Sequence, residues 1–144
     1  VRHKTRWLLV QIDFADMLED NHSTKNQKNK IEQAQTKDIF KAVANILTNS
    51  FGVAVSGITQ EIQVRHIDEP TGLVMIRTPR DGANQVRAAF TYLTELMGRS
   101  VSASVVAVSG NSRTARIRAM GEIQKRFREK LRQERQQQQQ QQQQ

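Results

Sequence analysis

Hydrophobic and polar positions follow two different periods along the chain, and each change of period marks an element of secondary structure. Residues 7–12 form an apolar run that is typical of a buried strand. From Thr36 onward, apolar side chains recur at helical spacing as far as Leu47, which predicts a helix with one buried face. The same analysis predicts four further elements: a strand over 58–67, a strand over 73–77, a helix over 81–97 and a strand over 101–108.

Turn and capping residues stand at the ends of these elements. A turn over 68–72 contains Pro70 and Gly72 and joins the two middle strands into a hairpin. Asp81 is expected to cap the second helix, and Gly98 is expected to end it. The predicted buried face of that helix consists of Val86, Ala89, Phe90, Leu93 and Met97.

The order strand, helix, strand, strand, helix, strand predicts an α+β domain of the ferredoxin-like class. Two β-α-β units that share a central hairpin form this split arrangement. The right-handed crossover rule then favours a four-stranded antiparallel sheet with two helices on one face. A further, basic helix begins near Thr114, and we expect it to pack on a sheet edge or on the open sheet face. The apolar stripe expected to make that contact contains Met120, Ile123, Phe127 and Leu131.

Two segments are too polar to take part in a core. Residues 15–36 are predicted to be an exposed insertion, and residues 133–144 are predicted to be a disordered glutamine-rich tail. The single ferredoxin-like domain therefore spans residues 1–132. No apolar run approaches the roughly 20 residues of a membrane-spanning helix, so we expect no membrane partner.

Basic residues are concentrated at the two ends of the chain. The 144 residues include 22 Lys or Arg and 14 Asp or Glu, which gives a formal net charge of +8. Residues 1–6 carry three basic side chains and no acid, and residues 113–135 carry nine basic and three acidic ones, whereas residues 7–112 are close to neutral. This distribution indicates a polyanionic partner. A solvent-exposed helix face is the alternative interpretation of the second basic segment.

The sequence contains no recognisable catalytic or metal-binding constellation. The absence of cysteine excludes disulfides, thiol catalysis and zinc–thiolate sites. Glycines occur singly rather than in a phosphate-binding loop, and His3, His22 and His66 fall in different elements. The strand over 73–77 has no aromatic side chain, so the base-stacking platform of RNA-recognition motifs is missing as well. We therefore expect a protein that is not an enzyme by itself and that binds RNA mainly through phosphates and RNA shape.

Three short motifs occur in order along the chain. The opening Val-Arg-His-Lys-Thr-Arg-Trp-Leu-Leu over 1–9 resembles the start of the Pop-type small protein subunit of eukaryotic ribonuclease P and RNase MRP. Residues 71–77, Thr-Gly followed by four aliphatic residues and an arginine, resemble its hairpin strand, and residues 106–110 resemble its Val-Ser-Gly segment. The resemblance covers residues 1–14 and about 37–120, in the order of the family.

This resemblance implies a non-catalytic subunit of a ribonucleoprotein endonuclease. Such particles remove 5′ leaders from precursor tRNA, and the related RNase MRP particle processes precursor rRNA. In both, the RNA is the catalyst and uses Mg²⁺, so the protein itself is expected to bind no cofactor. The implied partners are the ribonuclease P and RNase MRP RNAs, a TIM-barrel-like subunit and other proteins of the particle, in the nucleus and nucleolus. A stand-alone RNA-binding or ribosome-associated module is the alternative function.

The basic start of the chain is a candidate phosphate clamp. In an extended chain Arg2, Lys4 and Arg6 point to one side at intervals of about 6.5–7 Å, close to the phosphate step of an RNA strand. A solubilising terminus that merely flanks the first strand is the alternative.

Further candidates follow from the motifs and the basic helix. Arg77 ends an otherwise apolar strand, and it either lies near the RNA or a protein partner or pairs with Asp81 or Glu61 in a structural role. The turn after the last strand is expected to lie near the same partner. The complete predicted set of RNA-binding residues is Arg2, Lys4, Arg6, Arg77, Ser109, Gly110, Arg113 and Arg116.

Overall fold

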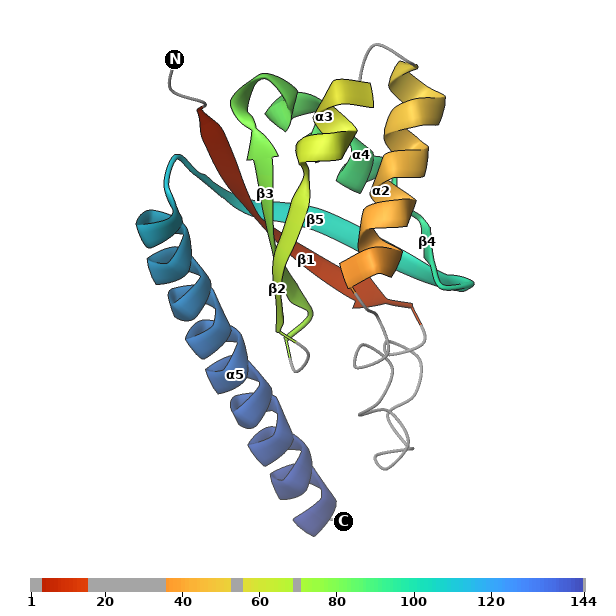
Figure 1. Cartoon of the computed structure of the whole chain (residues 1–144). Helices are drawn as coiled ribbons and strands as arrows, with labels where there is room; N and C mark the ends of the chain where they lie inside the picture. Colours follow the sequence, from red (N-terminus) through yellow and green to blue (C-terminus); the bar gives the residue numbers. More distant parts are fainter. Residues whose placement is uncertain (1–3, 16–35, 53–55, 69–70, 144) are drawn as a thin grey trace.

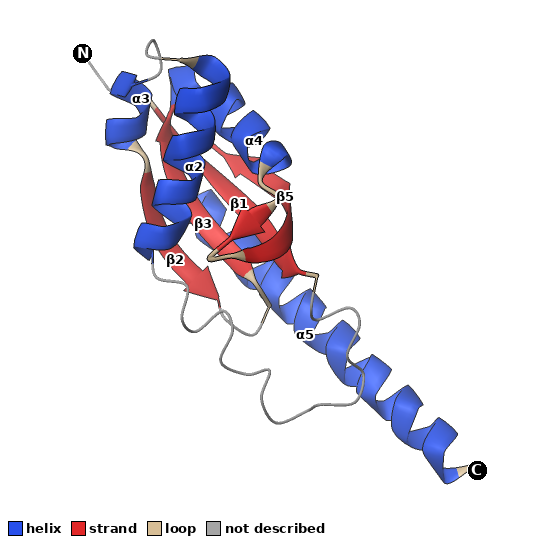
Figure 2. Ribbon diagram, turned by 90° about the vertical axis from the view of Figure 1, so that its right-hand side faces the viewer, coloured by secondary structure: helices blue, strands red, loops and turns tan. Residues whose placement is uncertain are grey.

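The computed structural model describes residues 4–15, 36–52, 56–68 and 71–143. The strands are β1 (Thr5–Phe14), β2 (Gln63–Asp68), β3 (Leu73–Pro79), β4 (Glu95–Leu96) and β5 (Arg99–Ser109). The helices are α2 (Thr36–Phe51), α3 (Ser56–Glu61), α4 (Ala83–Tyr92) and α5 (Ser112–Gln142), with a 3₁₀ turn, η2 (Arg80–Gly82). The strands form one antiparallel sheet in the order β2-β3-β1-β5-β4, with α2, α3 and α4 over one face and α5 over the other (Figures 1 and 2).

The main core lies between the sheet and the helices α2 and α4. Alternate side chains of the central strand β1 point into it, because successive residues of a strand face opposite sides. The predicted amphipathic helix after Thr36 is confirmed as α2, and its apolar face packs on this side. The residues of this core with at most 1% of their surface exposed are Leu8, Val10, Phe14, Ile39, Leu47, Ile76, Val86, Ala89 and Phe90.

A smaller core lies on the other face, under the first turns of α5. Ala115 is buried against Leu9 and Met75, and Ala119 and Ile123 pack around them. A β-bulge in β5 opposite Leu9 changes the alternation of that strand, so its neighbouring residues 106 and 107 both join this cluster. The basic helix therefore packs on the open sheet face, which was one of the two predicted positions.

The prediction of which residues hold the basic helix on the sheet was wrong for all but one of them. Ile123 contacts the sheet, but Met120, Phe127 and Leu131 are 62%, 53% and 39% exposed. The contact uses alanines instead, because small side chains let the helix backbone approach the sheet closely. The larger apolar side chains consequently point away from the domain.

Two other element predictions are corrected by the structure. Residues 58–61 belong to helix α3 rather than to a strand, and β2 begins only at Gln63. The helix α4 ends at Tyr92, five residues before the predicted end, and Asp81 lies in the preceding 3₁₀ turn, with no side-chain hydrogen bond capping either helix.

The earlier end of α4 makes room for a fifth strand. Met97 and Gly98 have φ values of +53° and +74°, and they form the two-residue loop of a tight hairpin between β4 and β5. The ferredoxin-like prediction is confirmed, with this short edge strand added to the four strands expected.

The glutamine tail differs from its prediction. Helix α5 continues through residue 142, and residues 133–142 are helical and exposed rather than disordered. Glutamine is a good helix former, and no glycine or proline in this stretch ends the helix. The predicted insertion over 15–36 lies almost wholly outside the described residues, as does Arg2. In the described part of the chain, no helix has the length and hydropathy needed to span a membrane.

Candidate nucleic-acid interface

The start of β1, the ends of β3 and β5, and the start of α5 meet at one end of the sheet, where these strands begin or stop. Trp7 at the start of β1 is directly opposite Arg77 at the end of β3 on one side and Ser109 at the end of β5 on the other. Helix α5 begins three residues after Ser109, so its first basic side chain, Arg113, belongs to the same region (Figure 1). We call this region the basic edge, and it comprises Lys4, Arg6, Trp7, Arg77, Arg80, Ser109, Gly110 and Arg113.

Arg77 and Trp7 form a direct contact within the basic edge. The guanidinium carbon of Arg77 lies 6.0 Å from the centre of the Trp7 ring, and both side chains are half-buried. This is the arrangement of a cation–π pair. Among the described residues, Arg77 forms no ion pair with Asp81 or Glu61. The partner of its side chain is the Trp7 ring instead of the carboxylates considered from the sequence.

Lys4 and Arg6 lie at the same edge but belong to the other side of the sheet. Side chains alternate along β1, so Arg6 lies on the face opposite to Trp7. Its Nη1 donates a hydrogen bond to the carbonyl oxygen of Thr5 at 3.0 Å. It also lies 3.8 Å from the place where a Cβ on Gly110 would stand, which is an ordinary van der Waals distance, so Gly110 lies directly beside the guanidinium. The backbone N–H of Arg80 donates to the carbonyl of Lys4 at 2.9 Å.

The first turn of α5 adds exposed cations on the Trp7 side. The side chain of Asn111 accepts a hydrogen bond from the backbone N–H of Thr114 at 2.8 Å, which caps the helix. Arg113 and Arg116 are then exposed in the first two turns. Arg118, one turn further on, donates from Nη1 to the carbonyl of Val108 at 3.2 Å and ties the helix to β5.

Most of the predicted RNA-binding residues thus lie at the basic edge, but they are divided between the two faces of the sheet. Arg2 lies outside the described residues, and Ser109 is only 6% exposed, so its side chain is mostly covered. Sequence reasoning missed Arg80, Arg118 and the role of Trp7. The pairing of Trp7 with Arg77 could have been found, because an antiparallel register between the first strand and the hairpin strand places the two residues opposite each other.

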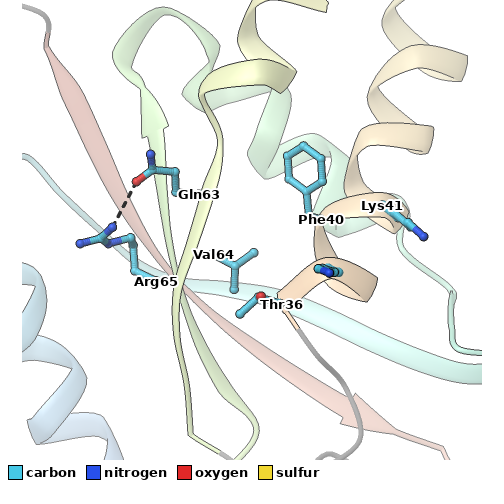
Figure 3. A pocket seen from close by; sticks show the side chains of 7 residues that line it. Thr36, Phe40, Lys41, Gln63, Val64 and Arg65 are labelled. Atoms are coloured by element: carbon cyan, nitrogen blue, oxygen red, sulfur yellow. Dashed lines mark hydrogen bonds between the residues drawn. The ribbon is translucent and has the colours of Figure 1, made fainter.

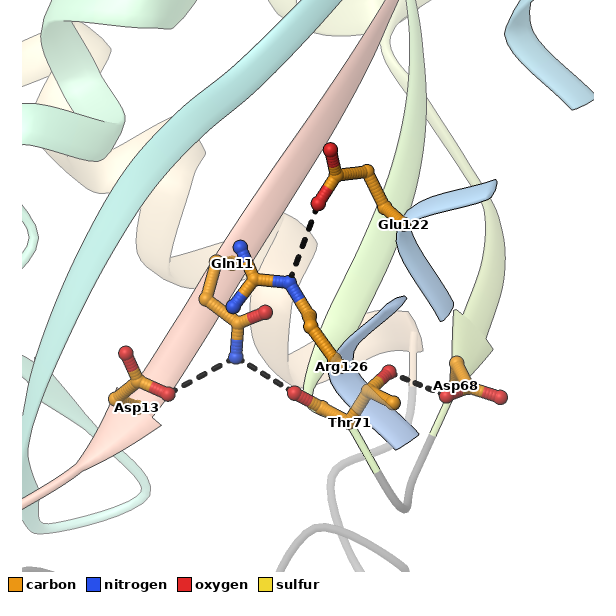
Figure 4. Close-up of polar contacts among 6 residues, drawn as sticks. All are labelled: Gln11, Asp13, Asp68, Thr71, Glu122 and Arg126. Atoms are coloured by element: carbon orange, nitrogen blue, oxygen red, sulfur yellow. Dashed lines mark hydrogen bonds and ion pairs between the residues drawn. The ribbon is translucent and has the colours of Figure 1, made fainter. Parts of the chain in front are cut away.

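A second polar cluster occupies the opposite end of the α5 face (Figure 4). The amide nitrogen of Gln11, which is 5% exposed, donates to Oδ1 of Asp13 at 2.9 Å and to the carbonyl of Thr71 at 2.6 Å. The hydroxyl of Thr71 donates to Asp68. Gln11 therefore connects β1 to the hairpin turn.

The backbone conformation and close packing at position 72 require a glycine. Gly72 has a φ of +74°, and a Cβ at this position would lie 2.5 Å from the carbonyl oxygen of Ile12. The Thr-Gly motif thus shapes the hairpin and does not supply chemistry. Helix α5 crosses nearby, where Nε of Arg126 lies 3.6 Å from a carboxylate oxygen of Glu122 in an ion pair.

An open groove of about 460 Å³ lies between α2 and the edge strand β2 (Figure 3). Phe40 and Val64 form its apolar part, and Lys37 and Lys41 line it from the helix. Arg65 also lines it and donates a hydrogen bond to Gln63 at 3.3 Å. No group of three His, Cys, Asp or Glu side chains that could hold a metal ion is present in this groove or elsewhere among the described residues.

The arrangement can be compared with known proteins. A family model described as the Rpp14/Pop5 family matches residues 6–120, which include all of the sheet except Thr5, and the first turns of α5 as well. The chain belongs to the Rpp14/Pop5 family. This membership confirms the resemblance seen in the sequence motifs. The family match ends before the second half of α5.

One curated relative supports the family assignment, and one solved structure has the same fold. The ribonuclease P/MRP protein subunit POP5 of Schizosaccharomyces pombe is 25% identical over 122 residues, which cover 83% of this chain and 86% of that protein. A chain of the cryo-EM structure of yeast ribonuclease MRP has the same fold, with a TM-score of 0.52 at 16% identity over 77% of each chain. In this chain α5 packs on the sheet face opposite α2 and α4, so that face offers no open base-stacking platform of the kind used by RNA-recognition motifs.

Proposed function

We propose that this protein is a subunit of the ribonuclease P and RNase MRP ribonucleoproteins, and that its basic edge binds the RNA of the particle. Family membership supports the assignment to the particle. The observation that supports the RNA contact is the convergence of Lys4, Arg6, Arg77 and Arg113 at one edge, where three strand ends meet. The segments 4–7, 77–80 and 109–113 of this edge contain no acid, although Asp81 follows directly.

Phosphate groups are the ligand that this edge suits best. Lysine and arginine side chains at strand ends and at a helix start can reach several phosphates of a folded RNA, and such contacts position a protein without reading bases. The cations lie on both faces of the sheet edge, so the RNA would wrap around the edge and not lie flat on one face. The protein would shape and position the RNA, and the RNA would carry out the cleavage with its own bound Mg²⁺.

The assignment extends to precursor tRNA and precursor rRNA as substrates of the particle. A TIM-barrel-like subunit and other particle proteins would be the protein partners, and the nucleus and nucleolus would be the location. A tagged copy of the full chain should therefore co-purify with one or two discrete RNAs, and its depletion should cause precursor tRNA with uncleaved 5′ leaders to accumulate. Recovery of a broad mixture of RNAs without that accumulation would favour a stand-alone RNA-binding or ribosome-associated module.

The catalytic role of the RNA has its own test. The purified, RNA-free protein is expected not to remove the leader of precursor tRNA in Mg²⁺ buffer, whereas the assembled particle does. Specific leader removal by the protein alone would overturn this part of the proposal.

A further inference from the structure

Helix α5 has two apolar sides, and only one of them contacts the domain. The sheet side is built from small residues, with Ala115 buried and Ala119 and Ile123 packed beside it. Larger apolar side chains stand on a second side and are exposed to solvent. They are Ile117 at 63%, Met120 at 62%, Phe127 at 53% and Leu131 at 39% exposure.

The exposed side chains form a regular seam along the helix. Positions 117, 120, 124, 127 and 131 follow one another at alternating intervals of three and four residues, which is the a and d spacing of a coiled coil. Gln124 is the one polar position inside this seam, and Glu134 occupies the next d position and ends it. From Ile117 to Leu131 the seam is about 21 Å long at the rise of an α-helix. We call these five positions the α5 seam.

The first turns of α5 lie on the sheet, and the rest of the helix extends beyond it. Figures 1 and 2 show the helix continuing well past the strands, with no other described element beside its second half. The seam is therefore accessible over two heptads. Phe127 and Leu131 also lie beyond residue 120, outside the part of the chain that the family model matches.

Charges beside the seam define what it can accept. The flanking e and g positions between 116 and 135 carry four basic side chains and no acidic one: Arg116, Arg128, Lys130 and Arg135. The acids Glu122 and Glu129 occupy f positions, on the opposite side of the helix. In coiled coils the e and g charges decide the partner, because opposite charges across the seam attract and like charges repel.

We propose that the α5 seam docks an amphipathic helix of a partner protein that carries acidic residues beside its own apolar stripe. A second copy of this chain is disfavoured, because parallel pairing would place Lys130 opposite Arg135 of the other copy. Antiparallel pairing would also bring basic flanks together. RNA would satisfy the cations but would leave four exposed apolar side chains without a partner. The acidic helix satisfies both features of the surface.

A pair of designed peptides tests this proposal with the full-length, RNA-free protein. Each peptide has three heptads with Leu or Ile at a and d, and the two differ only in carrying Glu or Lys at every e and g position. Fluorescence anisotropy with labelled peptides is expected to show binding of the Glu peptide and at least tenfold weaker binding of the Lys peptide. Charge reversal by R128E/K130E is expected to abolish that preference, because two acidic and two basic side chains then flank the seam.

Two double variants separate seam contacts from general attraction between charges. M120Q/F127Q keeps the net charge and changes only exposed side chains, so the protein should fold normally. Its affinity for the Glu peptide should fall at least about tenfold, as expected for the loss of two apolar anchors. The control K125Q/R132Q removes two charges from b positions outside the seam and its flanks. It should retain binding of the Glu peptide at moderate salt.

Several results would overturn the proposal. Failure of the Glu peptide to bind, or equal effects of the two double variants, would show that the seam is not a specific docking surface. Self-association of the wild-type chain in sedimentation experiments, abolished by M120Q/F127Q, would identify a second copy as the occupant. A loss of affinity for the particle RNA in M120Q/F127Q, with peptide binding unchanged, would assign this surface to RNA. These results are independent of the role of the basic edge, which none of these variants alters.

Discussion

The two faces of the sheet are covered in different ways. Under α2 and α4, large aliphatic and aromatic side chains such as Phe14, Leu47 and Phe90 are almost completely buried. Under α5, the contact is made by alanines and a few sheet residues, and it is bordered by Trp7 with Arg77 at one end and by the Gln11 cluster at the other.

This difference separates stability from recognition. The apolar area buried between the sheet and α2 and α4 is the main source of hydrophobic stabilisation, since the free energy scales with that area. The α5 face buries less and exposes more, with cations at the basic edge and an apolar seam on the helix. We therefore expect substitutions on the first face to change folding, and substitutions on the second face to change binding.

The largest effect on stability is expected for Phe90→Ala in the main core. Phe90 is fully buried, and its truncation leaves a cavity, so the free energy of unfolding should fall by about 3–5 kcal/mol. Trp7→Ala is the matched aromatic truncation on the other face. It should lower the free energy of unfolding by only about 1–2 kcal/mol, because Trp7 is only partly buried. Denaturant unfolding of both variants checks this, and equal losses would contradict the contrast between the faces.

The largest effect on RNA binding is expected for R2A/K4A/R6A at the start of the chain. Each lost phosphate contact should lower the slope of log affinity against log salt by about 0.7–0.9. The slope of the triple variant should therefore be shallower by about 2. The assembly of this protein with its protein partner, titrated with the particle RNA over a salt series, provides the measurement. K37A/K41A/R65A, which removes the same charge around the α2–β2 groove, is the control and should leave the slope nearly unchanged. An equal change in both variants would show that only net charge matters.

A smaller effect is expected for Arg77→Ala. Loss of the contact with Trp7 should cost about 0.5–1 kcal/mol of stability, as for cation–π pairs that are not fully shielded from water. The salt slope should fall by about 0.7–0.9 if Arg77 also meets a phosphate. Arg65→Ala on the neighbouring strand removes the same charge and serves as the control. If Arg77→Ala changes only the melting temperature and assembly is normal at matched folding, its role is structural.

The smallest effect is expected for removal of residues 16–35 together with residues 136–144. Neither segment has the composition to contribute to the core, and the α5 seam ends before the second one begins. The shortened protein should co-purify with the same RNAs in the same amounts as the full chain. Loss of that RNA would show that one of these segments takes part in assembly.

Much of the fold could be predicted because local patterns and long-range packing agree. The apolar run in β1, the helical period of α2 and the Thr-Gly hairpin each specify one element, and their order leaves the ferredoxin-like topology. Predictions were wrong where a short segment had two possible structures. Residues 58–61 have no clear period, and the region after Tyr92 could continue a helix or turn back, which only the pairing of β4 with β5 decides.

The sequence by itself determined the order of the elements, the uneven charge and the family motifs, because each depends on residue type and spacing along the chain. Only the tertiary structure decided which side of α5 meets the sheet, since alanines and larger apolar residues form two competing stripes on that helix. It also decided that Arg77 lies over Trp7, and that Arg6 lies on the other face of the same edge. These relations depend on strand register and on the close approach of two backbones, and neither is encoded in any one segment of the chain.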